Sequence, residues 1–153
     1  MAPKEPLTLY YRRTIPGTNE SSVAEIQTTS SVNGTSGVSF VGNIPMCDAD
    51  YKKFNKDILN FIGTRVPAKK SVGLPATLIE TITIISKPYQ TENSANMITA
   101  TANYIDSGSG SESKVPYVVF TVTGASGKFA GYKFLKITID NNGPEKKRVV
   151  TLY

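Results

Sequence analysis

The stretch from Pro116 to Asp140 (PYVVFTVTGASGKFAGYKFLKITID) most constrains the fold, because it holds two alternating segments joined by a glycine-rich loop. Every second residue is apolar from Val118 to Val122 and again from Leu135 to Ile139, which is the period of half-buried strands. Closely spaced glycines allow positive φ angles or the close approach of another backbone, so we expect the chain to turn sharply between the segments. The stretch therefore predicts a pair of strands with which the rest of the chain pairs.

The loop between these strands carries Gly124, Gly127, Phe129 and Gly131. An aromatic residue flanked by glycines is most simply a plug that folds back over one end of a barrel or sandwich and covers its core. Glycine-rich loops also bind phosphates, but those loops open a helix whose N-terminus faces the anion. Residues 132–140 alternate like a strand, so we interpret the loop as structural.

The run VTGASGKFAG, which ends at Gly131, resembles the G-x-[ST]-G-x-F-x-G segment of allene oxide cyclases and dirigent proteins. The stretch from Asn96 to Tyr104 is similar to an "ITA…Y" strand of the same families, so the resemblance covers roughly the last third of the chain. It implies an eight-stranded antiparallel barrel. In these families the barrel steers a lipid epoxide or orients phenoxy radicals, without a metal or a nucleotide.

Further strand patterns occur along the whole chain, with turn residues between them. Only 19% of the residues are charged, and 12 Gly and 9 Pro are spread along the sequence, as in proteins of many short strands. Asn33-Gly34 is a strong hairpin signal, and the Gly/Ser run at 106–113 indicates a long connection. We predict one all-β domain spanning residues 1–153, an antiparallel eight-stranded barrel. The other expected strands span 6–15, 23–29, 38–44, 78–86, 96–105 and 147–153.

One segment departs from this pattern. Tyr51, Phe54, Ile58 and Phe61 recur at helical spacing, Asp48 or Asp50 can cap the first turn, and Gly63 can end the last one. The spacing predicts a short amphipathic helix near residues 48–62 that covers the barrel.

The sequence contains no histidine, which removes the usual base at neutral pH, histidine-dependent catalytic arrangements and most zinc or copper sites. Nucleotide and calcium motifs are absent as well, so we expect no metal, no cofactor and no catalytic residue set. Glu80, Tyr104 and Cys47 are the candidate ligand-binding residues, chosen for their side-chain chemistry. Glu80 either points inward, where burial would perturb its pKa, or faces solvent, or sits near a strand end of a sheet covered on both sides.

The net charge of +5 is distributed over short basic groups, and the chain has no tryptophan for base stacking. We interpret these groups as solvated faces and edge-strand protection, and we expect no nucleic-acid partner. No apolar run reads as a signal peptide or a membrane span, so the expected location is soluble, inside a cell or within a particle. The single Cys47 cannot form an internal disulfide.

Taken together, the sequence favours a non-enzymatic barrel that acts as a structural or binding subunit of a larger assembly, through protein partners or as a homo-oligomer. A minor component of a viral particle (virion) is one such role. The alternative is a cofactor-free barrel like those of allene oxide cyclases and dirigent proteins, which binds and steers a small apolar substrate.

Overall fold

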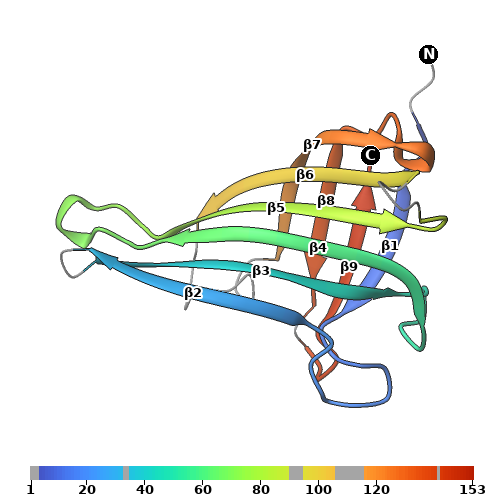
Figure 1. The fold of residues 1–153 in the computed structure, drawn as a ribbon, viewed down its shortest axis with the longest axis horizontal. Coiled ribbons are helices and arrows are strands. Elements are labelled where there is room, and N and C mark those ends of the chain that lie inside the picture. Colours follow the sequence, from blue (N-terminus) through green and yellow to red (C-terminus); the bar gives the residue numbers. More distant parts are fainter. Residues whose placement is uncertain (1–3, 33–34, 90–94, 106–115, 141) are drawn as a thin grey trace.

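The computed structural model of the chain describes residues 4–32, 35–89, 95–105, 116–140 and 142–153. These residues form one antiparallel sheet of nine strands (Figure 1). The hairpin turn expected at residues 33–34 and the Gly/Ser connection expected at 106–113 lie outside the described residues. The strands are β1 (Leu7–Arg12), β2 (Ala24–Val32), β3 (Thr35–Cys47), β4 (Phe54–Val66), β5 (Thr77–Ser86), β6 (Asn96–Ile105), β7 (Tyr117–Ser126), β8 (Phe134–Ile139) and β9 (Lys147–Leu152), with short 3-10 turns η1 (Lys70–Val72) and η3 (Gly127–Phe129).

The sheet closes where β1 pairs with β3, and β1 and β2 share that edge of β3. The strand order is β1-β9-β8-β7-β6-β5-β4-β3-β2, and β1 returns to pair with β3. β1 occupies the C-terminal end of this edge, where Tyr10 faces Cys47. β2 occupies the rest of the edge, from Ala24 opposite Asn43 onward. The predicted eight-stranded antiparallel barrel is therefore confirmed, and the structure adds that β2 lies outside the closed ring.

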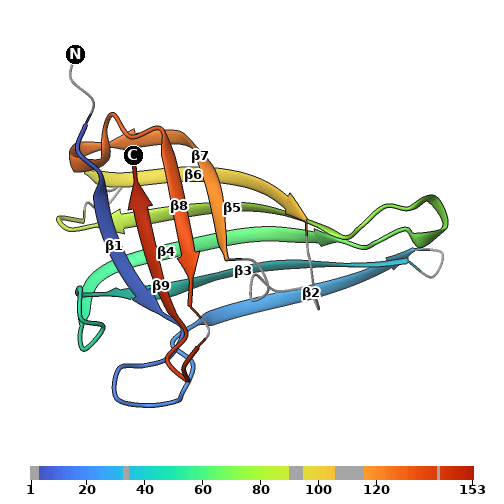
Figure 2. The ribbon, with the colours of Figure 1, turned by 180° about the vertical axis from the view of Figure 1, so that it is seen from behind.

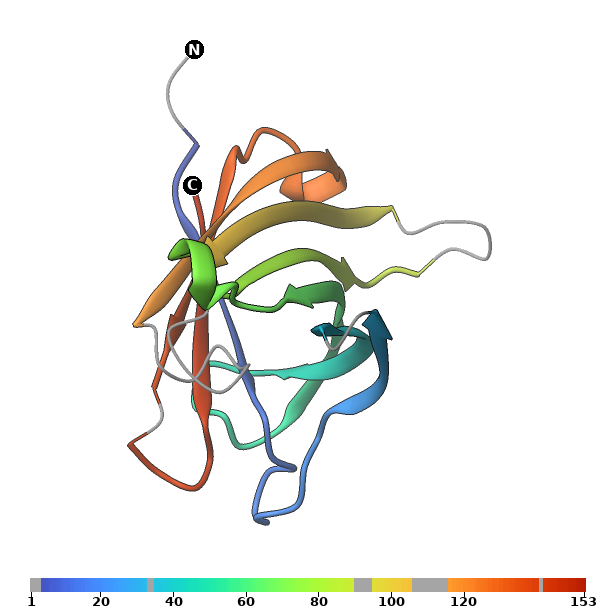
Figure 3. The same cartoon turned by 90° about the vertical axis from the view of Figure 1, so that its left-hand side faces the viewer.

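The long strands project beyond the closed part of the barrel. β3 and β4 have 13 residues each, whereas β1, β8 and β9 have six. Figures 1 and 2 show the short strands crossing the long ones at one end of the molecule, while β2 to β5 continue toward the other end. Figure 3 looks at this projecting end, where β2 (blue) lies at the margin of the sheet. The molecule thus has a closed end and a projecting end.

Alternating apolar side chains fill the closed end. Val118, Phe120, Leu135 and Ile137 are each at most 5% exposed, as the two alternating segments predicted. Phe129 is fully buried in the same core, so its predicted role as a plug is confirmed. Full burial of one such side chain stabilises the fold by about 1.5–3 kcal/mol relative to leaving it exposed.

The glycine-rich loop turns at two of the three predicted positions. Gly127 and Gly131 have φ angles of 59° and 96°, which favour glycine. A Cβ atom at Gly127 would also collide with the carbonyl oxygen of Ala95, so that turn packs directly against the start of β6. Gly124 instead lies within β7, where a Cβ atom would meet open space. The sharp turns begin after β7 ends.

The predicted helix at residues 48–62 is wrong. Residues 48–53 form a loop, and β4 begins at Phe54. The Asp48 carboxylate does accept backbone hydrogen bonds, from the N–H of Lys52 at 3.2 Å and of Lys53 at 3.4 Å, but it closes a loop and caps no helix.

A period of two within β4 overrides the helical spacing of its aromatic residues. Leu59 and Phe61 are buried in the core, at 2% and 8% exposure, whereas Ile62 between strands β3 and β5 is 58% exposed. The sequence ILNFI therefore alternates inward and outward as a strand does. Pairing with β3 and β5 on both sides supplies the tertiary contacts that decide between the two periods.

Candidate functional site

Two of the three residues proposed as ligand contacts lie together on the inner face. Glu80 pairs with Ala102, and Tyr104 pairs with Leu78, the residue two positions before Glu80 on β5. Ile82 and Ile84, which share the face of Glu80, are 1% and 0% exposed, so Glu80 points into the barrel. Glu80 and Tyr104 are both half-buried and both engage partners. The inward alternative for Glu80 is therefore the one that the structure shows.

Cys47 lies away from this pair. It ends β3 at the closed end of the barrel, whereas the cross-strand row of Glu80 reaches β3 at Phe40. Seven residues of strand separate those two positions, a distance of about 23 Å at about 3.3 Å per residue. Burial raises the pKa of the Cys47 thiol, although the backbone and the charge of Arg12 oppose this shift. The three candidate residues therefore do not form one site.

Aromatic side chains occupy the inner face between these positions. Phe40 faces Gly63 across the β3–β4 ladder, and Gly42 faces Phe61 in the next inward row. The two rings pack with their centroids 6.0 Å apart. A Cβ atom at Gly63 would lie 2.8 Å from the carbonyl oxygen of Ile79, so the glycine leaves room for the ring of Phe40 above it. In each of these two pairs a phenylalanine ring occupies the space over the facing glycine, so the chain's own side chains fill the interior.

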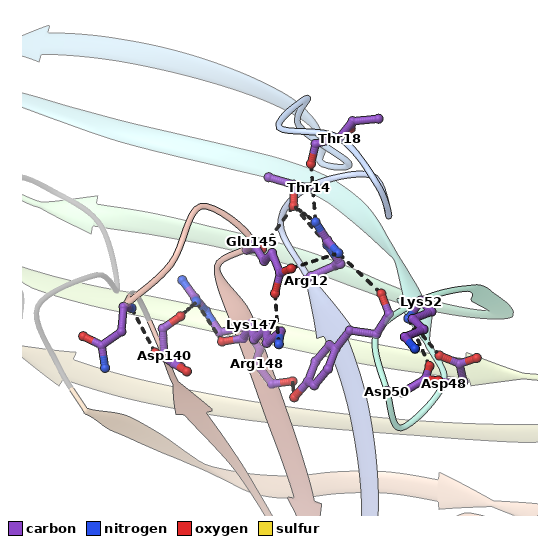
Figure 4. Close-up of polar contacts among 12 residues, drawn as sticks. Arg12, Thr14, Thr18, Asp48, Asp50, Lys52, Asp140, Glu145, Lys147 and Arg148 are labelled. Atoms are coloured by element: carbon purple, nitrogen blue, oxygen red, sulfur yellow. Dashed lines mark hydrogen bonds and ion pairs between the residues drawn. The ribbon is translucent and has the colours of Figure 1, made fainter.

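At the end of the barrel away from the Phe129 plug, where β1 ends beside Cys47, a polar cluster surrounds two buried arginines (Figure 4). Arg12 is 5% exposed, and its Nε and Nη2 atoms donate to Thr14 Oγ1 at 3.0 and 2.8 Å. Its Nη1 atom donates to the carbonyl of Tyr51 at 3.4 Å and lies 4.0 Å from the Glu145 carboxylate. Arg148 is 2% exposed and donates to the carbonyls of Lys147 and Asp140 at 3.0 and 3.3 Å. Arg12 and Arg148 belong to the short basic groups that were interpreted as solvated, Arg12-Arg13 and Lys146-Lys147-Arg148, and their burial shows that this interpretation is wrong for both arginines.

Tyr51 covers this cluster from the 48–53 loop. Its hydroxyl donates to the carbonyl of Arg148 at 3.2 Å, and its ring packs edge-on against Tyr10 with the centroids 5.5 Å apart. Burial raises the pKa of Tyr51 to about 12. Lys147 lies over the same ring at 5.1 Å and contacts Glu145 at 2.9 Å, and this hydrogen bond lowers the pKa of Glu145. The contacts join three loops to β1 and β9, so we interpret the cluster as a structural closure.

The outer face of the projecting strands carries a groove of about 840 Å³. Its walls come from β2, β3, β4 and β5, and most of its lining residues point away from the barrel interior. The lining consists of Val23, Ala24, Glu25, Ile26, Val41, Gly42, Asn43, Asn60, Phe61, Ile62, Thr81 and Thr83.

Three apolar side chains form a row across this groove. Ile26 pairs with Val41, which pairs with Ile62, so one residue from each of β2, β3 and β4 lies in register. Their exposures are 71%, 46% and 58%, which is high for large apolar residues. We call Ile26, Val41 and Ile62 the outer apolar row. This row was not predicted from the sequence, and its one local signal is that Ile26 alternates with the polar residues Glu25 and Gln27.

The groove offers binding groups and little reactive chemistry. Asn43, Asn60, Thr81 and Thr83 supply amide and hydroxyl groups beside the apolar row. Among the lining residues Glu25 alone is ionisable, and its carboxylate accepts a hydrogen bond from Gln27 at 2.9 Å. Hydrogen-bond donors and acceptors beside exposed apolar area are the composition of a contact surface.

Within the described part of the chain, no cluster of three or more histidine, cysteine, aspartate or glutamate side chains has an arrangement that suits a metal ion. The helical turns that the structure describes are too short and too polar to cross a bilayer.

Comparisons of the sequence with protein-family models and with curated proteins, and a comparison with solved structures, gave no significant match. The fold and the site together define a class: a closed eight-stranded antiparallel barrel with an added ninth strand and an exposed apolar row on its outer face.

Proposed function

We propose that this protein is a non-enzymatic β-barrel that acts as a structural or binding subunit of a larger assembly, for which a viral particle is one setting. The observation that carries the proposal is the contrast between the two faces of the long strands. Their inner face is filled by Phe40, Phe61 and the buried core, while their outer face exposes the outer apolar row above a groove. A barrel of eight strands is just wide enough for its own side chains to fill it.

Exposed apolar area of this kind is costly in water unless a partner covers it. Three large aliphatic side chains in one row, each about half exposed or more, exceed the scattered apolar residues of an ordinary surface. Ile79 on the neighbouring strand β5 is 51% exposed on the same outer face and extends the apolar area. The arrangement supports association through this face.

The alternative function is the binding and steering of a small apolar molecule, as the resemblance to allene oxide cyclases and dirigent proteins implies. The placement of Glu80 and Tyr104 on the inner face favours it, because both are polar groups beside an apolar interior. Phe40, which lies in the same cross-strand row as Glu80, narrows the space that such a ligand would need.

Measurement of the native particle separates the two functions. The protein is purified from its source without denaturation, its mass is determined, and small molecules are extracted and identified. The proposed function predicts a particle heavier than the 16.5 kDa chain and no stoichiometric small molecule. A lone chain that retains an apolar molecule would refute it and support the alternative.

A further inference from the structure

β2 presents an unpaired edge within the described part of the fold. It pairs with β3 along all nine of its residues, and the ring closes through β1 and β3 without it. Figure 3 shows β2 at the margin of the projecting sheet. Backbone N–H and C=O groups on such an edge are a template for another strand.

The sequence of β2 lacks most of the usual protection of an exposed edge. Natural edge strands carry lysine, proline, bulges or inward-pointing charges that prevent pairing with other chains. The segment AEIQTTSSV has no proline and no basic residue, and its pairing with β3 runs without a register shift. Its one charge, Glu25, lies on the inner-face row of Gly42 and Phe61 and is the only one of these protective features that β2 has. Its isoleucine, threonines and valine favour extended structure. This edge is built to accept a strand.

We propose that β2 pairs antiparallel with β2 of a second copy of this chain, around a two-fold axis at Ile26. This inference rests on the proposed function and names its partner. Each Ile26 then faces its own counterpart, and the two outer apolar rows join into one continuous row across both copies. The contact covers the most exposed large apolar side chain of the described residues, since Ile26 is 71% exposed.

The position of the two-fold axis follows from the side chains on both faces. With the axis at Ile26, Glu25 faces Gln27 of the second copy, which replaces the hydrogen bond that Gln27 makes to Glu25 within one copy. An axis one residue earlier would place two Glu25 carboxylates opposite each other, which is destabilising. An axis at Thr28 would place Ile26 against Ser30 and leave the apolar rows apart.

A second copy fits this edge better than an unrelated strand because the edge is complementary to itself. The same short segment supplies both the apolar residue at the axis and the acceptor and donor on either side of it. Two-fold pairing also uses one surface twice, as in the commonest homodimers.

The first test compares association of the full chain and two variants by sedimentation equilibrium over a range of concentrations. The wild type should reach twice the 16.5 kDa of one chain. Ile26→Lys places two like charges at the axis and should raise the dimer dissociation constant at least about tenfold. Ile105→Lys is the matched control, since Ile105 is 57% exposed at the end of β6, away from the β2 edge, and it should leave dimerisation unchanged.

The second test fixes the register by oxidation of single cysteine variants. Directly facing residues of an antiparallel pair have Cα atoms about 4.5–5.5 Å apart, within the range that a disulfide spans. Ile26→Cys should therefore form a disulfide-linked dimer, and Thr28→Cys should not, because its two copies would lie about 14 Å apart. Cys47 is 1% exposed and stays out of the reaction.

The results distinguish a failure of the β2 pairing from a failure of the proposed function. The β2 pairing is overturned if the wild-type chain stays monomeric at every concentration, or if the Thr28→Cys variant cross-links more readily than the Ile26→Cys variant. If a chain that fails this test still occurs in a larger native particle, the proposed function stands. A native monomer that carries an apolar molecule overturns both.

Discussion

Truncation of the plug residue, Phe129→Ala, should be among the most destabilising single substitutions in this barrel. The side chain is fully buried in the core, at the turn that follows β7. Loss of a buried phenylalanine removes its transfer free energy and leaves a cavity, together worth about 3–5 kcal/mol. Its contact with Lys128, whose Nζ lies 5.2 Å from the ring, adds little because the lysine is exposed.

The matched control is Phe134→Ala, which removes the same side chain from an exposed site. Phe134 is 41% exposed, and its ring packs against the ring of Tyr153, with the centroids 5.6 Å apart. Such an aromatic pair is worth about 0.5–1.5 kcal/mol beyond its buried area. The free energy of unfolding from urea titration should therefore fall at least about 2 kcal/mol further for Phe129→Ala than for the control.

The comparison has a clear failing result. Equal losses for the two variants, or a loss below about 1 kcal/mol at Phe129, would show that the ring does not close the core. If Phe129→Ala does not fold, Phe129→Leu replaces it, and its loss should still exceed that of Phe134→Leu.

Two other predictions concern the interior and the polar closure. Gly63→Ala should destabilise the fold by about 1–3 kcal/mol, because its Cβ would lie 2.8 Å from the backbone oxygen of Ile79; an unchanged urea midpoint would contradict the close packing of Phe40. The wild type should lose stability relative to Tyr51→Phe as the pH rises from 10.0 to about 12, because the raised pKa of Tyr51 means that folding favours its protonated form. The contribution of Tyr51 to the free energy of unfolding is complete below the ordinary tyrosine pKa and is lost as the pH rises through the pKa of Tyr51 in the folded state. Parallel curves of unfolding free energy against pH for the two proteins over this range would refute the burial of Tyr51.

The sequence predicted the strands whose period is unambiguous. Val118 and Phe120 occupy alternate positions, as do Leu135 and Ile137, so their inward positions were assigned correctly. Phe129 was interpreted as a plug because an aromatic residue between glycines, whose backbone turns easily, can fold back over the core, and the structure buries it there. These features depend on local sequence alone.

The segment at residues 48–62 shows where a single periodicity misleads. Its aromatic and aliphatic residues fit a helical repeat, but Leu59 and Phe61 also fit an inward strand face, and pairing with β3 and β5 decides between them. Local sequence holds no information on those neighbours. The loop before β4 was predicted to be a helix start because Asp48 or Asp50 can accept backbone N–H groups there. A carboxylate that accepts such hydrogen bonds closes a tight loop equally well, as these two residues do.

The candidate site shows the same division. Glu80 and Tyr104 were chosen for their chemistry, and their shared face follows from strand alternation once β5 and β6 are paired. The separation of Cys47 from them, the burial of Arg12 and the free edge of β2 all depend on which strands share the edge of β3. That arrangement is a property of the topology, and the alternation within each strand does not reveal it.

Amide hydrogen exchange along β2, measured at low and high protein concentration, tests most directly whether this barrel associates through its free edge. The account predicts that exchange of alternate amides between Ala24 and Val32 slows as the concentration rises, while the amides of β4, which is paired on both sides, keep the same rates. Exchange rates in β2 that stay constant over the whole concentration range would contradict it.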